Sequence, residues 1–245
     1  MADSADSEQS FLEHLSELRS CLIKSIAGAS IGSIVCFFFS SYLFSVLSSP
    51  LIAAMPEAEL VGLGPAEAFI VKLKVALVSG IVLASPVIFF QLWTFISPGL
   101  HENEQKLALP FVAISTFSFL TGILFCFFVI LPFAFSFFLG EFQSINVEPT
   151  IRIGEYLGFV LKLLLVFGSV FNLPVVSWFL AKLGILTPEW LVKNGRYAIL
   201  GIFIVAAILT PPDIATQLLL AGPLIVLYGI CIQVTKIANK PSSKD

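Results

Sequence analysis

Long apolar runs separated by short polar stretches make up most of this chain. A helix needs about 20 apolar residues to cross a bilayer, and most of these runs reach that length. The fifth run covers only about 13 residues, or roughly 20 Å at 1.5 Å per residue, against ~30 Å of hydrocarbon. The pattern predicts an all-α integral membrane protein with six transmembrane helices, at residues 25–47, 67–90, 107–140, 156–183, 197–209 and 214–235.

A short amphipathic helix is predicted before the first span, over residues 11–22. Its apolar residues share one helical face, at positions i, i+4, i+7 and i+11: Phe11, Leu15, Leu18 and Leu22. We expect this helix to lie at the membrane interface and to run into the first span. The chain is accordingly interpreted as a single transmembrane domain, 1–245, with a cytoplasmic amphipathic N-terminus (1–20), a six-helix bundle (21–235) and a cytoplasmic tail (236–245).

Residues 91–106 stand out as a short, charged loop between the second and third spans. The loop reads QLWTFISPGLHENEQK, and it contains Phe95 and several ionisable side chains: His101, Glu102, Glu104 and Lys106. Charged residues make up only 12% of the chain, so this concentration of exposed charge is a clue to function.

Composition confirms the membrane assignment and narrows the possible functions. The chain is 58% hydrophobic, and its 12% of charged residues is about half the share of a typical soluble domain. A net charge of −3 does not suggest a nucleic-acid partner. The chain has neither a P-loop motif nor an HExxH motif, and its cysteines form no CxxC pair. We therefore predict no catalytic residues, no metal site and no cofactor.

The positions of Lys and Arg set the predicted orientation. One side of the membrane has most of these residues in its loops and termini: Arg19, Lys24, Lys106, Lys193, Arg196, Lys236, Lys240 and Lys244. The other side has only Arg152 in its loops. Because cytoplasmic loops are enriched in Lys and Arg, both termini are predicted to be cytoplasmic. The N-terminal helix and the 91–106 loop then share the cytoplasmic face.

Two carboxylates on that face, Glu17 and Glu104, are candidates for binding a cationic ligand. A pair of guanidinium groups would suit them, because Arg meets a carboxylate through two parallel hydrogen bonds and Lys cannot. The alternative is that both are merely solvated charges.

Small and polar residues within the spans have two interpretations each. Gly28 and Gly32 form a GxxxG motif, which indicates either packing against a sister helix or dimerisation. Pro174 leaves a backbone carbonyl one turn earlier unpaired, and Asn172 could satisfy it. A polar residue at membrane depth is also a functional candidate, so both interpretations of Asn172 remain open.

Two helix starts are predicted from capping residues. One is formed by Thr187, Pro188 and Glu189, and at the other Asp213 can cap the sixth span.

Four segments resemble the TatC family, the multi-span core of the twin-arginine protein translocase. In order they are FLEHLSELRSCLIKS, SPVIFFQLWTFISPGLHENEQK, FGSVFNLPVV and LTPPDIATQ. The resemblance implies a cupped bundle of six helices, N-in and C-in, with short fifth and sixth helices. It implies a receptor for signal peptides with an Arg-Arg pair, which moves folded proteins with the proton-motive force. The implied partners are single-span TatA- and TatB-type subunits, with self-association in the receptor complex. A bacterial inner membrane fits better than a thylakoid membrane.

The resemblance also assigns roles to individual residues. Signal-peptide binding is implied for Glu17, Arg19, Phe95, Leu100 and Glu104. Structural or partner-contact roles are implied for Pro50, Asn172, Asp213 and Gln217. The family often has Glu where this chain has Asn172, so we interpret that position as a hydrogen-bonding site.

A proton- or ion-coupled secondary transporter of small solutes is the alternative function. Such proteins usually show internal repeats and ionisable residues near the membrane midplane. No repeat is evident here, but Lys162 and Asn172 lie in one predicted span, so the alternative stays open.

Overall fold

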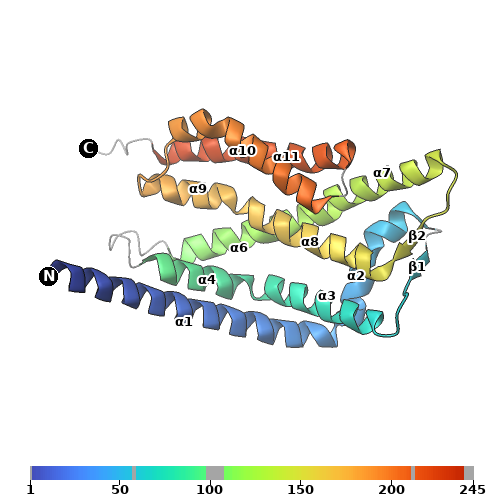
Figure 1. The fold of residues 1–245 in the computed structure, drawn as a ribbon, viewed down its shortest axis with the longest axis horizontal. Coiled ribbons are helices and arrows are strands. Elements are labelled where there is room, and N and C mark those ends of the chain that lie inside the picture. The colour runs from blue at the N-terminus through green and yellow to red at the C-terminus, as the bar shows by residue number, and fades with distance from the viewer. Residues whose placement is uncertain (1, 57–58, 98–107, 211–212, 240–245) are drawn as a thin grey trace. The chain divides into compact units, whose positions relative to one another are not determined.

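The computed structural model describes residues 2–56, 59–97, 108–210 and 213–239, and the side chains of these residues except 2–13 and 59. Nearly all of this part is helical (Figure 1). The elements are α1 (Ala2–Phe38), α2 (Ser40–Ala54), β1 (Glu59–Val61), α3 (Glu67–Leu83), α4 (Ser85–Ile96), α6 (Ala108–Phe125), the π-helical segment η2 (Cys126–Ile130), α7 (Leu131–Ser144), β2 (Thr150–Arg152), α8 (Ile153–Phe171), α9 (Leu173–Lys182), α10 (Pro188–Leu209) and α11 (Ile214–Ala238).

The described helices account for the predicted number of spans. Five stretches are long and apolar enough to cross a membrane: His14–Phe38, Ala108–Ser144, Ile153–Lys182, Pro188–Leu209 and Ile214–Ala238. The helices α3 and α4 are bent by 55° relative to each other, and taken together as one broken span they make the sixth. The bend lies at Ala84, just before Pro86, which has no N–H to donate to a carbonyl in the preceding turn. The chain is an all-α, multi-span membrane protein, as predicted.

The first predicted span ends earlier in the structure than in the sequence interpretation. α1 ends at Phe38, and residues 40–54 form a separate helix, α2, which contains the buried Pro50. Proline at position 50 cannot donate to the carbonyl of Val46, four residues earlier. The Ser49 hydroxyl donates to that carbonyl instead, at 2.8 Å, so α2 continues through the proline. This contact supports a structural role for Pro50.

The fifth and sixth helices each contain the span predicted for them. α10 has 22 residues and includes 197–209, and α11 has 25 residues and includes 214–235. α10 begins at Pro188, where Thr187 caps it by accepting a hydrogen bond from the Trp190 N–H at 3.3 Å, as its sequence predicts. Its first turns contain Glu189, Lys193 and Arg196, so its uncharged part remains the predicted 197–209.

The chain folds into two compact units, residues 1–41 with 72–117 and residues 42–71 with 118–245. In the first unit, α1 runs alongside α3 and α4 (Figure 1). A Cβ atom on Gly32 would lie 2.7 Å from the Gly80 carbonyl oxygen, and one on Gly28 would lie 3.3 Å from Val87 Cγ1. The GxxxG motif therefore packs against sister helices, which confirms that interpretation of it.

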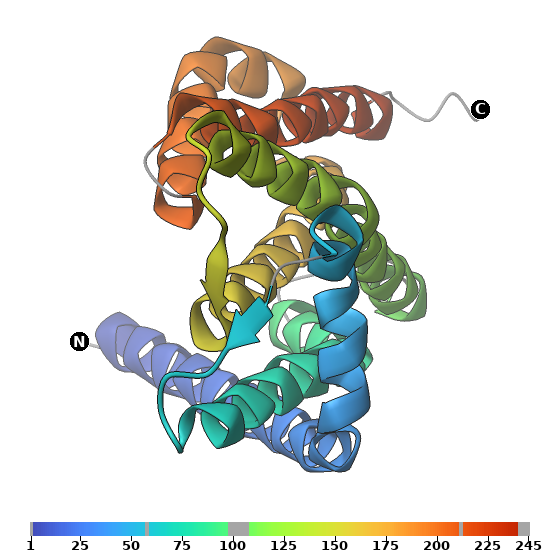
Figure 2. The same cartoon turned by 90° about the vertical axis from the view of Figure 1, so that its right-hand side faces the viewer.

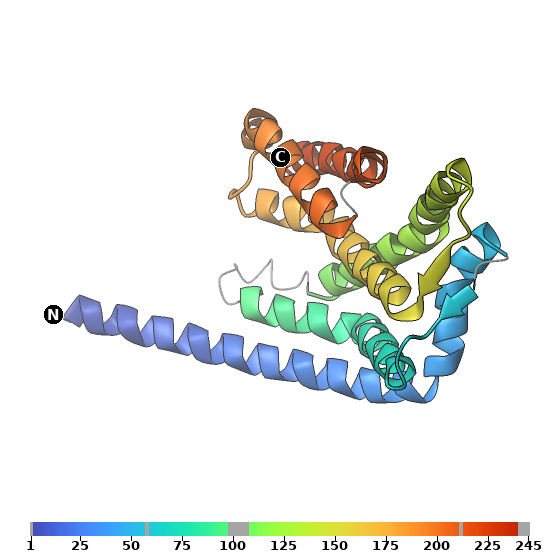
Figure 3. The ribbon, with the colours of Figure 1, turned by 45° about the vertical axis from the view of Figure 1, so that its right-hand side comes forward.

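The second unit is held together by helix packing of the same kind. α11 packs against both α9 and α10 (Figure 3). α6 crosses α8 closely, since a Cβ atom on Gly122 would meet the Phe167 carbonyl oxygen at 2.5 Å. The Ser118 hydroxyl adds a hydrogen bond of 2.6 Å to the Phe171 carbonyl at this crossing.

A two-stranded parallel sheet in the second unit was not predicted. β1 pairs with β2 in the register Glu59–Thr150, Leu60–Ile151 and Val61–Arg152 (Figure 2). Each strand has three residues, too few to show the alternating pattern by which strands are found in a sequence.

Glu67 fastens the segments around this sheet. Its carboxylate accepts hydrogen bonds from the N–H groups of Leu63, at 2.7 Å, and Gly154, at 3.2 Å. It also lies 3.8 Å from Arg152, which pairs at 3.1 Å with Glu155. One side chain thus joins the start of α3, the loop before it and the start of α8. Carboxylates at helix N-termini are also favoured by the helix dipole.

Replacing Glu67 with alanine should therefore destabilise the protein. Glu67→Ala leaves two backbone N–H groups and Arg152 without this partner, so the midpoint of thermal unfolding in detergent should fall by several degrees. Glu155→Ala is the matched control, because it removes an exposed carboxylate from the same arginine and should shift the midpoint much less. Equal shifts for both variants would contradict the role assigned to Glu67.

Candidate functional site

Packing of α1 against α4 brings His14, Glu17 and Phe95 together in the first unit; we call these three residues the α1–α4 cluster. The ring centroids of His14 and Phe95 are 4.4 Å apart, with 22° between the ring planes. His14 Nδ1 lies 3.6 Å from Glu17 Oε2, an i,i+3 pair on one side of α1. Because α4 continues to Ile96, Phe95 lies in its last turn and can reach α1.

The Glu17 carboxylate in this cluster is available to a ligand. Its side chain is 50% exposed, and its imidazole partner is a cation only when it is protonated. A carboxylate beside an aromatic face suits a guanidinium, which forms two parallel hydrogen bonds with the first and stacks on the second. The predicted partners Leu100 and Glu104 lie outside the described residues.

Arg19 is not part of the cluster. A step of two residues along a helix rotates the side-chain direction by about 200°, so Arg19 points away from Glu17. It lies instead along a hollow on α1 with Ser16, Ser20, Ile23 and Lys24. The structure therefore connects Glu17 to Phe95 through His14, and Arg19 points away from Glu17.

The sequence interpretation did not select His14 and misassigned residues 91–96. The His14–Glu17 spacing was a visible signal, but the stacking on Phe95 depends on tertiary packing. Residues 91–96 were expected in a loop and belong to α4, in which Trp93 is buried. The helix continues because four of its last five residues are apolar, and it ends before Pro98, which disfavours helix in the preceding residue.

Asn172 occupies the break between α8 and α9 in the second unit. Its backbone N–H bonds to the Ser169 carbonyl, three residues back, and its side-chain amide donates to the Gly168 carbonyl at 3.1 Å. The carbonyl that Pro174 leaves without its usual donor belongs to Val170, and the backbone N–H of Asn172, rather than its side chain, also reaches it. The Asn172 side chain is buried, and its Oδ1 atom has no hydrogen-bond partner among the described residues.

Asp213 and Gln217 anchor the first turn of α11. Asp213 Oδ1 accepts from the Thr216 N–H at 2.7 Å, and its other oxygen accepts from the Thr216 hydroxyl, so the predicted cap is confirmed. Gln217 donates through Nε2 to the Phe203 carbonyl of α10 at 3.1 Å. Both contacts support structural roles for these residues.

The described residues do not gather three or more His, Cys, Asp or Glu side chains into a possible metal site. What they offer is a half-exposed carboxylate next to an aromatic ring. This arrangement can bind a cationic group without performing covalent chemistry.

Comparisons with known proteins agree with one another. The model of the TatC family, described as Sec-independent protein translocase protein (TatC), matches residues 13–223. A protein of that description from Desulforapulum autotrophicum is 44% identical over 236 residues, covering 96% of this chain and 87% of the relative. One from Aquifex aeolicus is 41% identical over 229 residues, covering 93% and 95%. The crystal structure of a twin arginine translocase receptor, TatC, is 40% identical with a TM-score of 0.86, covering 93% of this chain and 100% of that one.

Removing the Asp213 cap should loosen the start of α11. Asp213→Ala should lower the free energy of unfolding by about 1 kcal/mol, because N–H groups in the first turn of the helix lose their acceptor. Hydrogen exchange should report faster exchange at the Thr216 amide. Asp213→Asn keeps one acceptor oxygen and should retain most of the protection. Unchanged exchange in Asp213→Ala would show that the cap contributes nothing.

Proposed function

The chain belongs to the TatC family of Sec-independent protein translocase proteins, and from this premise we propose that it binds twin-arginine signal peptides. Family membership makes it a multi-pass membrane component of the twin-arginine translocase. The translocase function replaces the secondary-transporter alternative, which no contact among the described residues favours. The proposal assigns the chain no catalytic step.

The contact that supports this proposal best is the α1–α4 cluster. The stacking of His14 on Phe95 places the Glu17 carboxylate beside an aromatic ring, at the ends of α1 and α4 that are predicted to be cytoplasmic. In the proposed complex, the two signal arginines dock on Glu17 and Glu104, and Phe95 packs beside them with Leu100 nearby. A carboxylate pair of this kind distinguishes Arg from Lys, because only a guanidinium offers two parallel donors.

The rest of the proposal follows the family. The apolar part of the signal lies against a single transmembrane domain whose termini are both cytoplasmic. Assembly with TatA- and TatB-type single-span subunits, and self-association, complete the translocase, which the proton-motive force drives. The membrane is the bacterial inner membrane. Asn172 is a candidate contact for a partner helix through the resemblance alone, since its side chain is buried in this chain.

A short span can thin the bilayer locally, which would ease passage of the cargo, and the helix lengths limit where this could occur. α11 has 25 residues and is long enough to span the hydrocarbon without thinning it. In α10 only residues 197–209 are free of charge, about 13 residues or roughly 20 Å. Thinning to match that uncharged stretch would therefore occur at α10.

Signal binding should depend on the two carboxylates and on guanidinium chemistry. The purified chain should bind a labelled twin-Arg signal peptide more tightly than the same peptide with Lys-Lys. Glu17→Gln and Glu104→Gln should each weaken twin-Arg binding about 5-fold, the upper range for a partly exposed ion pair. Fluorescence anisotropy of the labelled peptide gives both affinities.

Glu189→Gln is the matched control for this experiment. Glu189 is an exposed carboxylate at the start of α10, on the membrane face predicted to be cytoplasmic. Its replacement should leave peptide affinity unchanged, whereas a general attraction of cations to this face would make all three variants weaker. Equal affinity for the Arg-Arg and Lys-Lys peptides would contradict the proposed recognition.

A further inference from the structure

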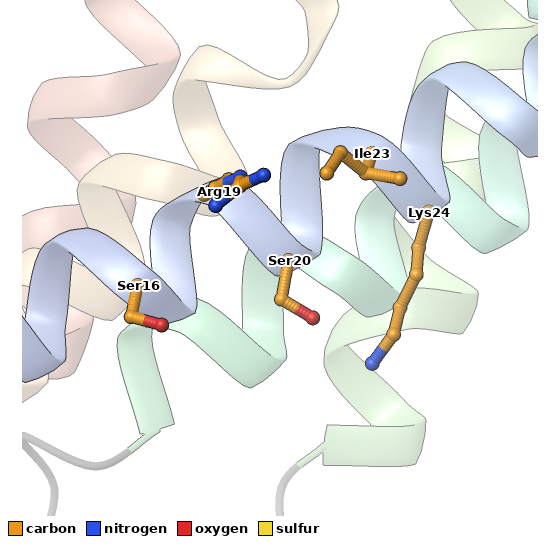
Figure 4. Close-up of a pocket in the computed structure, with 5 residues that line it drawn as sticks. All are labelled: Ser16, Arg19, Ser20, Ile23 and Lys24. Carbon is orange, nitrogen blue, oxygen red and sulfur yellow. The ribbon is translucent and has the colours of Figure 1, made fainter.

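A hollow of about 300 Å³ lies along the cytoplasmic end of α1, and the α1–α4 cluster does not use it. Five side chains from successive turns of the helix line it: Ser16, Arg19, Ser20, Ile23 and Lys24 (Figure 4). In Figure 4 the hydroxyls of Ser16 and Ser20 and the amine of Lys24 follow one edge of the helix. We call these five residues the α1 cationic stripe.

The chemistry of the stripe suits an anion. Arg19 and Lys24 flank two hydroxyl groups that can donate hydrogen bonds, and the stripe itself contains no carboxylate. The ion pairs between described side chains involve neither of these cations, and both are exposed. Arg19 points away from Glu17, whereas Lys24 lies on nearly the same side of α1 as Glu17 but about two turns further along the helix. A phosphate group matches this combination of two cations and hydroxyl donors.

The position of the stripe along α1 indicates that this phosphate belongs to a lipid. Lys24 is the last Lys, Arg, Asp or Glu before Glu57, so the hydrocarbon boundary lies close to it. The helix presents large apolar side chains to its surroundings at this level, with Leu22 58%, Ile23 55% and Ile26 56% exposed. A ligand bound here would therefore have a charged head beside Arg19 and Lys24 and apolar chains beside Ile23. Clusters of Lys and Arg at the cytoplasmic end of a span attract anionic lipids in this way.

We propose that the α1 cationic stripe binds the phosphate headgroup of an anionic phospholipid. The bound lipid fixes the depth and rotation of α1 at the cytoplasmic surface. Because Lys24 lies on the same helix about two turns after Glu17, this anchoring also helps to keep His14 of α1 stacked on Phe95 of α4. The proposal does not depend on signal-peptide binding, and its test uses lipid binding alone.

Native mass spectrometry of the full-length protein, released from detergent and titrated with phosphatidylglycerol, tests this site. Each of the variants Arg19→Gln and Lys24→Gln should weaken binding of phosphatidylglycerol about 5-fold. The double variant should therefore weaken it about 25-fold. Arg19→Lys with Lys24→Arg keeps both charges and should retain binding. The matched control is Arg196→Gln with Lys193→Gln, which removes the same two residue types from the exposed start of α10 and should leave this binding intact.

Two further titrations separate the possible sources of the phosphate. Phosphatidylcholine, whose headgroup has no net charge, should bind equally weakly to the wild-type protein and to the Gln variant of the stripe. Inorganic phosphate at concentrations comparable to the lipid should not displace phosphatidylglycerol, because it lacks the apolar chains. Displacement by inorganic phosphate would overturn the lipid assignment in favour of a soluble anion. If the stripe variant and the α10 control lost the same affinity for phosphatidylglycerol, the proposed site itself would be overturned.

Discussion

The close approach of α1 to α3 at Gly32 and Gly80 is the contact on which the first unit depends. Neither position has room for a Cβ atom: on Gly32 it would lie 2.7 Å from a backbone oxygen of α3, and on Gly80 it would meet the backbone of Ser33. In a membrane, helices associate through such close packing of small residues, because lipid and protein are equally apolar. This crossing aligns α1 with α3 and α4 and so brings His14 onto Phe95. The candidate site is therefore a consequence of backbone packing far from its own residues.

The N-terminal half of α1 has two chemically different sides. One side has Glu17 beside His14 and Phe95, and the other has Arg19 along the cationic stripe. Helix geometry separates these charges, since residues two apart project in nearly opposite directions. A cationic peptide and an anionic headgroup can then bind the same short segment without competing. This separation also explains why Glu17 and Arg19, although close in sequence, need not neutralise each other.

Most spans could be predicted from the sequence because they are long apolar runs, and the caps at Thr187 and Asp213 follow from local hydrogen bonding. Features that depend on tertiary contacts could not be predicted. The stacking of Phe95 on His14 joins residues about 80 positions apart, and apolar periodicity contains no information on such a pair. The interpretation of residues 91–96 as a loop gave too much weight to the charges after Pro98. For Asn172, the proline two residues later was expected to free a backbone carbonyl, but the break between α8 and α9 and the bond of the side-chain amide to Gly168 were not predicted.

The central claim is that α1 and α4 combine Glu17 and Phe95 into one recognition site. A double-mutant cycle on twin-Arg peptide binding tests it most directly, with Glu17→Gln, Phe95→Leu and the double variant. If the two side chains hold the same arginine, the double variant should lose less affinity than the product of the single losses, with a coupling of at least about 2-fold. Losses that multiply without coupling would show that Glu17 and Phe95 act independently, and the shared site would have to be abandoned.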